Sequence, residues 1–405
     1  MAPSKQDNIK RGALRNGNGL NFQNSVRAVV SRIDLSAGNS TDDVNGRVDH
    51  DNSSVSSASA FDRYGNYVFT ALETSREVAV IDAYGRQEVA RFVVGRAPQG
   101  LVVSPDGLRL YVNNFMDRTV QVFDLSALMN RGEKTFALLA TYSPVATERL
   151  TAQVLNGKRL FYDARDPRLA RDSYISCASC HNDGGQDGRV WDFTGFGEGL
   201  RNTSALRGRS GGQGFLHWSA NFNEVQDFEA QIRNFAGGLG LMTDAQFNTG
   251  TRNTPLGDPK AGVSADLDAL AAYLVSLNTF ERSPFRNSDG TLTTDAVAGR
   301  AIFANANCAQ CHGGVAFSSS GNATLFNIGT LKPSSGQRLG GALNGIVTDQ
   351  NSGVVANAEV VATNVQTNIE TRTTTTDAGV YRLSSLPRQI QNHGQGAGLS
   401  NDHRQ

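Results

Sequence analysis

Apolar and polar positions alternate in short runs through residues 25–145, where β-branched stretches are separated by Gly, Asp and Asn turns. Runs that are short and bounded by turn residues predict antiparallel strands. Three equivalent apolar runs end in aspartate: Val29–Asp34, Val78–Asp82 and Thr119–Asp124. Asp82 and Asp124 are 42 residues apart, as are the turn residues Gly65 and Gly107. The first part of the chain is therefore predicted to be all-β and repetitive.

The repeat has the size of a β-propeller blade, because four short strands and their turns occupy about 40–45 residues. The stretch Val103–Val112 also resembles the YVTN-type propeller repeat. A generic β-sandwich is the alternative. Fewer than three blades fit into residues 25–145, whereas a closed propeller needs at least about four. We therefore expect a partial propeller, with upstream blades missing or its edge completed by another element.

Residues 146–340 have a different pattern, with apolar residues at helical spacing between long Gly-rich loops. Helices are predicted over Glu148–Asp163, Asp266–Leu277 and Thr293–Ala306. Two of them lead toward short cysteine-containing motifs. The sequence thus predicts a mainly α domain with little other regular structure.

All four cysteines of the chain lie in two copies of a Cys-x-x-Cys-His motif. The copies are Cys177, Cys180 and His181, and Cys308, Cys311 and His312. This spacing is the attachment signal for haem c: two thiols on one turn reach the two vinyl groups, and the histidine binds the iron. A thioredoxin-like pair does not require the histidine, a zinc site needs pairs close together, and disulfides at this spacing are strained. We therefore predict two covalent haem c groups, with iron bound by His181 and His312.

The chain becomes β-like again over residues 341–390, where alternating valines and threonines are separated by Asp and Gly turns. This stretch resembles the carboxypeptidase-regulatory-like module of cell-surface proteins, although one expected strand is missing. Residues 1–24 are expected to be a disordered or cut end, and residues 391–405 a disordered tail. The predicted fold class is multidomain: a partial β-propeller, a mainly α dihaem cytochrome c domain and a small β-sandwich module.

Charge and hydropathy restrict the kinds of binding partner and the cellular location that the sequence predicts. The 38 basic and 38 acidic residues balance, so the sequence points to neither nucleic acid nor a membrane surface. No apolar run is long enough for a transmembrane segment. The N-terminus is polar and has no signal peptide, yet bacterial haem c is attached outside the cytoplasm. We expect a periplasmic or cell-surface protein whose leader is absent from this sequence.

The middle of the chain resembles the bacterial dihaem cytochrome c peroxidase/MauG family. The resemblance rests on both haem motifs and on the segments Asn156–Phe161, Arg168–Leu169, Ile175–Ser176, Arg201–Leu206, His217–Trp218 and Asn327–Gly329. It implies that the N-terminal haem, on His181, reacts with hydrogen peroxide. The haem on His312 would receive electrons from a small redox protein or another electron donor.

The resemblance also suggests further site residues, each with a structural alternative. Trp218 would relay electrons between the haems, or is a core aromatic residue. Asn202 would bind calcium, or caps a turn. Glu229 and Gln226 are favoured, within an acidic cluster, for moving a proton between the peroxide oxygens. His217 would be a sixth ligand of the first iron, or is a surface histidine.

The sequence departs from the family pattern after the second haem motif, and this departure makes other functions possible. The cytochrome pattern stops near Gly340, where the family supplies a distal ligand for the second iron. The alternative function is a non-enzymatic dihaem electron-transfer protein on a surface scaffold. In a third hypothesis the propeller and the β module bind a surface partner. Met242 is a candidate thioether ligand or a core residue, and His50, His393 and His403 are expected in polar loops.

Overall fold

The computed structural model describes most of the chain, apart from several loops and both stretches that flank the C-terminal β region. The described residues are 1–8, 24–35, 41–193, 199–208, 214–279, 282–313, 317–318, 341–350, 353–364, 370–386 and 390–393. They belong to two compact units, residues 1–189 with 203–323 and residues 190–202 with 324–405. Each unit is described by itself.

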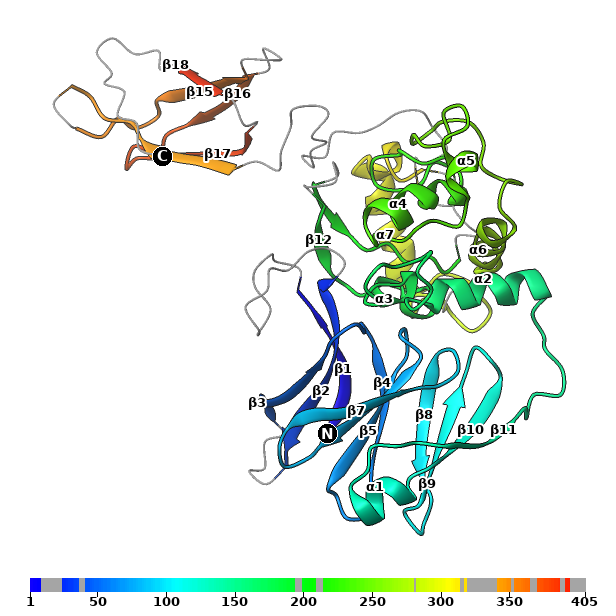
Figure 1. Ribbon diagram of the computed structural model, residues 1–405. Helices are drawn as coiled ribbons and strands as arrows, with labels where there is room; N and C mark the ends of the chain where they lie inside the picture. Colours follow the sequence, from blue (N-terminus) through cyan, green and yellow to red (C-terminus); the bar gives the residue numbers. More distant parts are fainter. Residues whose placement is uncertain are drawn as a thin grey trace. The chain divides into compact units, whose positions relative to one another are not determined.

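Antiparallel sheets form the N-terminal part of the first unit (Figure 1). Two are four-stranded meanders, and the sheet before them has three strands in the order β1-β2-β3. The first meander contains β4 (Ser56–Phe61), β5 (Tyr67–Leu72), β6 (Glu77–Asp82) and β7 (Gln87–Val93). The second contains β8 (Pro98–Val103), β9 (Arg109–Asn114), β10 (Thr119–Asp124) and β11 (Leu138–Tyr142). The three-stranded sheet contains β1 (Ala2–Asp7), β2 (Val26–Asp34) and β3 (Thr41–His50). Each meander has the strand order of a propeller blade.

The 42-residue repeat has a structural counterpart in the two meanders. Asp82 ends β6 and Asp124 ends β10. Gly65 and Gly107 both have a left-handed backbone, with φ of 75° and 79°, in the turns that precede β5 and β9. Only glycine adopts this conformation without a steric penalty, so the same tight turn recurs in both blades. The predicted repeat is confirmed for two of its three runs, whereas the run Val29–Asp34 lies in β2 of the three-stranded sheet.

The N-terminal end differs from the expectation of a disordered or cut segment over residues 1–24. Ala2–Asp7 is strand β1 and pairs antiparallel with β2 along its whole length. Main-chain hydrogen bonds make this pairing, so the polar sequence gave no signal for it. Ser4 N also donates to Ser56 Oγ at 2.9 Å, which ties β1 to β4. Residues 9–23 lie outside the described residues.

One short helix of the first unit, α1 (Ser126–Arg131), lies between β10 and β11, and the other helices follow the sheets in sequence. They are α2 (Ala152–Tyr162), α3 (Cys177–Cys180), α4 (Glu229–Asn234), α5 (Asp244–Phe247), α6 (Ala265–Ser276) and α7 (Thr294–Asn305). Short 3-10 turns add η2 (Asn182–Gly184), η4 (Val225–Phe228) and η5 (Cys308–Gln310). Helices α2, α6 and α7 confirm the three predicted helices. Within the described residues, no helix is both long enough and apolar enough to cross a membrane.

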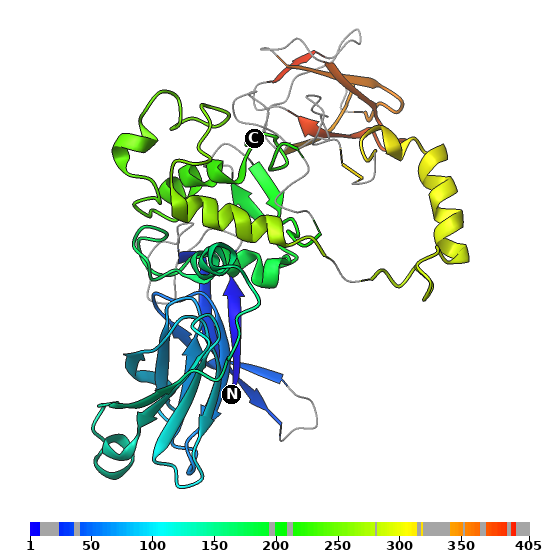
Figure 2. The same ribbon diagram turned by 90° about the vertical axis from the view of Figure 1, so that its right-hand side faces the viewer.

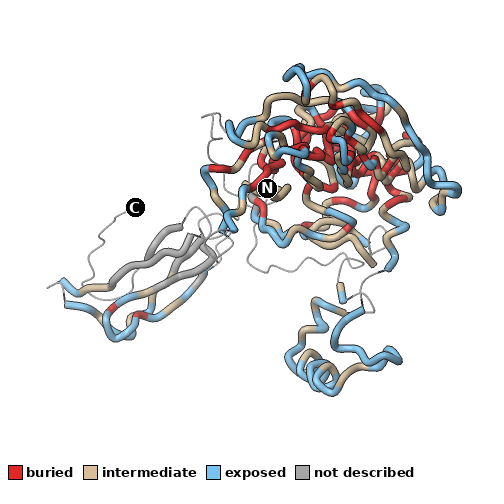
Figure 3. Tube along the Cα trace, turned by 90° about the horizontal axis from the view of Figure 1, so that it is seen from below, coloured by how far each residue is buried: buried red, intermediate tan, exposed pale blue. Residues whose placement is uncertain are grey.

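Helices α2 and α6 lie directly against each other (Figures 1 and 2). The contact is made at Gly157, where a Cβ atom would lie 1.8 Å from the carbonyl oxygen of Ala269. A glycine here lets the two backbones approach more closely than side chains permit. Around the contact, Leu160, Phe161 and Leu270 belong to one buried cluster. Burial of these side chains holds the helical part together. Figure 3 shows the buried residues of the chain in red.

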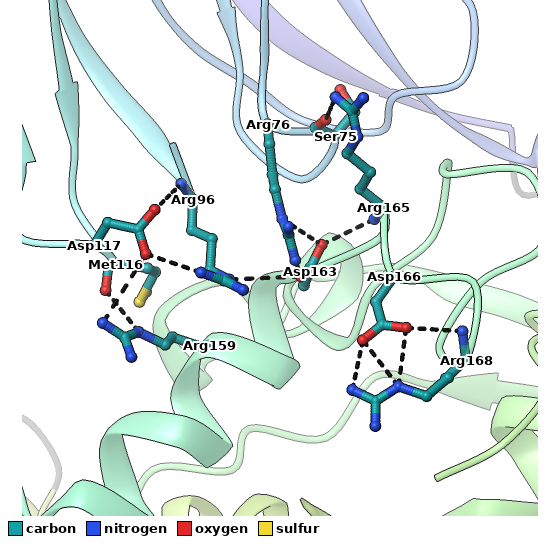
Figure 4. A network of polar contacts seen from close by, with 10 residues as sticks. All are labelled: Ser75, Arg76, Arg96, Met116, Asp117, Arg159, Asp163, Arg165, Asp166 and Arg168. Atoms are coloured by element: carbon teal, nitrogen blue, oxygen red, sulfur yellow. Dashed lines mark hydrogen bonds and ion pairs between the residues drawn. The ribbon is translucent and has the colours of Figure 1, made fainter. Parts of the chain in front are cut away.

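Turns of the two blades contact both ends of α2. Arg76, in the turn between β5 and β6, donates from Nε to Asp163 Oδ1 at 3.0 Å, just after the helix. Arg118, at the equivalent turn position of the next blade, donates from Nε to Glu148 Oε2 at 2.7 Å, just before the helix. Between them, Arg159 Nε of α2 donates to the carbonyl of Met116 at 3.0 Å (Figure 4). The blades and the helices therefore share a polar interface.

The second unit is β-structured. A hairpin pairs β12 (Val190–Phe193) with β13 (Gly199–Asn202). Further along, β14 (Gly341–Ile346) pairs with β17 (Val380–Leu386). A three-stranded sheet has the order β16 (Glu370–Thr374), β15 (Glu359–Asn364), β18 (Ile390–His393). The expected disordered tail therefore does not begin at residue 391, because β18 continues to His393; residues 394–405 lie outside the described residues.

Candidate functional site

The first Cys-x-x-Cys-His motif folds as a single helical turn, α3. The amide of His181 donates to the carbonyl of Cys177 at 2.9 Å, which closes the turn. Before it, Ser176 N donates to Ser179 Oγ at 2.9 Å. Residues three apart on a helical turn lie on the same side, so both thiols of this motif face one way. All four cysteines of the chain are free thiols.

His181 is oriented as an iron ligand would be. Its Nδ1 lies 3.3 Å from the carbonyl oxygen of Gly185. Because a carbonyl only accepts, Nδ1 carries the proton and Nε2 keeps its lone pair for a metal. Burial lowers the pKa of His181, which favours the neutral imidazole that iron requires. Geometry and protonation therefore agree with the predicted role.

One side of the first motif is apolar. Cys177 packs against the buried cluster that contains Ala178, Phe161 and Tyr273. Burial raises the pKa of the Cys177 thiol to about 11, and it also raises the pKa of Cys180. An apolar wall beside two thiols and an imidazole is what a porphyrin face needs, since its carbon framework is largely apolar. The residues of the first motif therefore fit haem c.

A tyrosine of α2 is linked to the turn after His181. Tyr162 Oη donates to Asp183 Oδ1 at 2.8 Å and accepts from the Asp183 amide at 3.1 Å. Burial raises the pKa of Tyr162 well above its usual value. The phenol therefore stays protonated and holds the loop that carries Gly185.

The second motif repeats this geometry on η5. The amide of His312 donates to the carbonyl of Cys308 at 2.9 Å. Nδ1 of His312 lies 3.2 Å from the carbonyl oxygen of Phe317. As at His181, this partner places the proton on Nδ1 and leaves Nε2 for a metal. Both motifs thus present the same ligand atom.

The environment of the second motif is much more open. His312 is exposed, and none of the described residues of α7 is buried. Ile302 of α7 is 67% exposed and Phe317 is 64% exposed. Phe303 and Phe317 meet edge to face, with ring centroids 5.7 Å apart. The two motifs share a local shape and differ in burial.

His217 and Trp218 lie in the segment between β13 and η4. Nδ1 of His217 lies 2.7 Å from Asn221 Oδ1, and its Nε2 lies 3.1 Å from Gln231 Nε2. The imidazole also packs against Phe222 at a centroid distance of 4.3 Å. Trp218 is 56% exposed. Both ring nitrogens of His217 have protein partners, and its ligation of the first iron stays a prediction, as does the relay role of Trp218.

Glu229 and Gln226 make polar contacts that connect elements. Glu229 is fully buried and accepts from the amides of Leu241 at 2.8 Å and Met242 at 3.1 Å. It also accepts from Arg233 Nε at 2.9 Å. Gln226 Nε2 donates to Asp268 Oδ1 at 2.8 Å. These contacts join η4 and α4 to the loop before α5 and to α6, and proton transfer by either residue stays a prediction.

The acidic cluster has two further members with structural partners. Asp227 accepts from Lys260 Nζ at 2.5 Å, and both side chains are almost completely buried. Glu224 accepts from the amide of Lys260 at 2.6 Å. Lys260 thereby ties its loop to η4. Sequence reasoning missed this lysine, since no local pattern pairs it with residues more than thirty positions earlier.

The structure also places three further residues that the sequence analysis singled out. Met242 is 3% exposed and packs in the core cluster, as its structural alternative proposed. His50 is not in a polar loop: it ends β3, is fully buried, and its Nδ1 lies 2.6 Å from Glu88 Oε2. Asn202 ends β13 in the second unit, and its role toward calcium is a prediction. The described residues contain no cluster of three or more His, Cys, Asp or Glu side chains placed to hold a metal ion.

Known proteins resemble parts of this chain. A family model for the carboxypeptidase regulatory-like domain matches residues 342–392. Hydrazine synthase subunit gamma of Kuenenia stuttgartiensis is 32% identical over 160 residues, which cover 38% of this chain and 41% of that protein. Cytochrome c peroxidase Ccp of Escherichia coli K12 is 30% identical over 202 residues, covering 41% and 40%. Cytochrome c551 peroxidase of Pseudomonas aeruginosa is 28% identical over 206 residues, covering 44% and 54%.

The chain therefore spans about half or less of the length of the curated relatives it matches. Among solved structures, the β-propeller domain of Cps50 (Swd1) from Myceliophteria thermophila overlaps 22% of this chain and 27% of its own. The identity is 19% and the TM-score 0.21. A similarity this weak carries no argument about the fold. The description of the two meanders as blades rests on their strand order alone.

Proposed function

We propose that the chain is a haem c oxidoreductase of the peroxidase type, which reduces hydrogen peroxide or uses it to oxidise a partner. Reduction of one peroxide consumes two electrons and two protons and yields two waters. Bound haem would supply the redox-active iron for this reaction. The carrying observation is that both Cys-x-x-Cys-His turns direct Nδ1 of their histidine to a main-chain carbonyl. Similarity to two cytochrome c peroxidases supports the same reaction class.

The two sites would have different tasks. The turn that carries His181 packs against an apolar cluster through Cys177 and Ala178, which suits a sheltered site where peroxide is bound and cleaved. His312 lies on an exposed turn, which suits electron entry from a small redox protein or another donor. This division of tasks follows the order of the two haems in the resembling family. It also agrees with the difference in burial between the two motifs.

Proton movement is proposed for Glu229 and Gln226. A carboxylate fixed by two amides and an arginine is held in one orientation, and it can act only if a neighbouring water or peroxide reaches it. Trp218 is proposed as the relay toward the second haem, and its exposure of 56% leaves its indole reachable. The proposed roles of Glu229, Gln226 and Trp218 all depend on their side chains, so a single substitution at each residue tests its role.

The test uses protein matured with the bacterial haem-attachment machinery. Peroxide consumption is measured with an added reduced electron donor, and turnover should exceed that of free haem at the same concentration. Glu229→Gln should lower turnover while the visible spectrum stays unchanged. Glu133→Gln, at an exposed loop position, is the control and should turn over like the parent. Turnover no greater than that of free haem would rule out the enzyme.

A second function, non-enzymatic electron transfer, is favoured by one observation. Both oxygens of Glu229 already accept hydrogen bonds from protein donors, so a peroxide proton would have to compete with those donors. In an electron carrier both irons are six-coordinate and low-spin. A high-spin signal indicates an open iron and favours the peroxidase, whereas a purely low-spin spectrum favours the carrier. We also propose an extracytoplasmic location, since haem c is attached there in bacteria.

A further inference from the structure

The first haem motif has contacts outside the helical segments. Its third residue, Ser179, is completely buried, and its Oγ lies 2.6 Å from Oγ of Ser54, in the loop between β3 and β4. Its carbonyl accepts from Nζ of Lys5, in β1, at 2.7 Å. Ser54 and Lys5, both from the sheet region, thus contact Ser179, which immediately precedes the second cysteine of the motif. By contrast, Gln310 at the same place in the second motif accepts from Asn307 of its own turn.

Lys5 belongs to a compact set of charges beside this motif. Its Nζ lies 3.1 Å from Asp7 Oδ1 and 3.9 Å from Asp187 Oδ2. The carboxylate of Asp7 also accepts from Arg189 Nε at 3.2 Å. The side chains of Asp7 and Asp187 are each 3% exposed, and that of Lys5 is 23% exposed. Among the residues that the structure describes, two cations and two carboxylates balance here, so loss of Lys5 removes one positive charge next to the motif.

We propose that Lys5 is a positioning and potential-setting residue of the first haem site. Its hydrogen bond fixes the carbonyl of Ser179 and hence the turn that presents Cys180 and His181. Its charge favours the reduced iron, because reduction removes one positive charge from the haem. Partial burial weakens screening by solvent, so the charge acts more strongly on the motif beside it than an exposed charge would. Strand β1 is then part of the redox site, although it lies more than 170 residues before the motif in sequence.

The proposal rests on haem attachment at the first motif and not on the peroxide reaction. The experiment therefore starts from Cys308→Ala/Cys311→Ala protein, which should carry only the first haem, as intact mass verifies. Lys5→Met is made in this background, and the midpoint potential is measured by spectroelectrochemistry. The equilibrium constant for reduction should fall by about three- to tenfold, where tenfold is 59 mV for a one-electron couple.

Three controls separate charge from shape. Lys5→Arg keeps the charge and should restore the potential. Lys134→Met removes the same charge from an exposed loop between α1 and β11, and should leave the potential unchanged. Ser54→Ala removes the contact with Ser179 Oγ without changing charge, and should shift the potential much less than Lys5→Met.

The outcomes are distinct. An unchanged potential in Lys5→Met, in protein with one haem and a parental visible spectrum, overturns the proposal. Equal shifts in Lys5→Met and Lys5→Arg overturn the charge argument and therefore the proposal as stated. If Lys5→Met lowers expression, the same comparison is made between Lys5→Gln and Lys5→Arg. Absence of haem from the parent protein would instead contradict the proposed function.

Discussion

Arg76 Nε donates to Asp163 Oδ1 at 3.0 Å, which joins a turn of the first four-stranded blade to the C-cap residue of α2. The second guanidinium nitrogen makes an ion pair with the other carboxylate oxygen. Asp163 is 5% exposed, and the neighbouring Arg96 pairs with Asp117 of the next blade (Figure 4). Burial and the nearby charge of Arg96 lower the pKa of Arg76 to about 10.

Removal of Arg76 should leave a buried carboxylate without its main partner. Arg76→Met is expected to destabilise the first unit by about 2 kcal/mol, the size of a hydrogen bond to a charged group. Among the described residues, Asp163 would keep only the amide of Arg165 at 3.0 Å and the more distant Arg96 Nε at 4.0 Å. Urea unfolding followed by circular dichroism measures the change. Arg131→Met breaks an exposed pair with Glu133 and should leave the unfolding midpoint unchanged. An equally small effect of both substitutions would show that the contact does not hold α2.

The contact at the other end of α2 should depend on pH. The hydrogen bond from Arg118 lowers the pKa of Glu148 to about 2, from an ordinary value of 4.5. A lowered folded-state pKa stabilises the protein above the unfolded-state value and ceases to do so as pH falls through the folded-state value. The midpoint difference between the parent and Glu148→Gln should therefore be full above about pH 4.5 and shrink toward pH 2. A difference that stays constant from pH 7 to pH 2 would contradict this assignment.

The close approach of α2 and α6 predicts an unusual cost for a single methyl group. Gly157→Ala places Cβ against the main chain of Ala269, which cannot move aside without parting the helices. We expect a loss of about 3 kcal/mol, at the upper end for overpacking. The matched control is Gly299→Ala in α7, where a Cβ meets nothing within 4 Å. That change should favour the helix by about 0.5–1 kcal/mol, and equal effects of the two substitutions would refute the packing argument.

The two proximal histidines should differ in consequence. His181→Ala is expected to abolish the peroxide reaction, because it removes the iron ligand at the proposed peroxide site. His312→Ala should leave the first iron able to bind carbon monoxide or cyanide while blocking electron entry. Ligand titration of both variants checks this. If ligand binding disappears in His312→Ala and persists in His181→Ala, the tasks of the two haems are reversed.

Local patterns predicted the elements but not the contacts between them. Helices α2, α6 and α7 lie where apolar spacing predicts them, and the 42-residue repeat marks the turns at Gly65 and Gly107. Strand β1 was missed because a polar strand pairs through its main chain. The equivalent arginines Arg76 and Arg118 are also 42 residues apart, each with φ of 58°. No sequence pattern links them to their partners, which lie just beyond the two ends of α2.

The candidate site was predictable only where its chemistry is local. Each Cys-x-x-Cys-His motif is contained in five residues, so its spacing alone predicts haem c, and the Nδ1 contacts of His181 and His312 are compatible with that prediction. The partners of Ser179 lie in β1 and in the loop before β4, and no sequence pattern connects them. Glu229 was singled out as a proton-transfer group from an acidic cluster, whereas its contacts with Leu241, Met242 and Arg233 depend on folding.

The central claim, that both motifs carry haem c, is tested most directly by intact mass and visible spectrum after maturation with the haem-attachment machinery. The account predicts a mass gain of two haem groups per chain. Cys177→Ala/Cys180→Ala and Cys308→Ala/Cys311→Ala should each carry one. A chain that gains no haem mass, or that keeps two haems after either pair of substitutions, would contradict it.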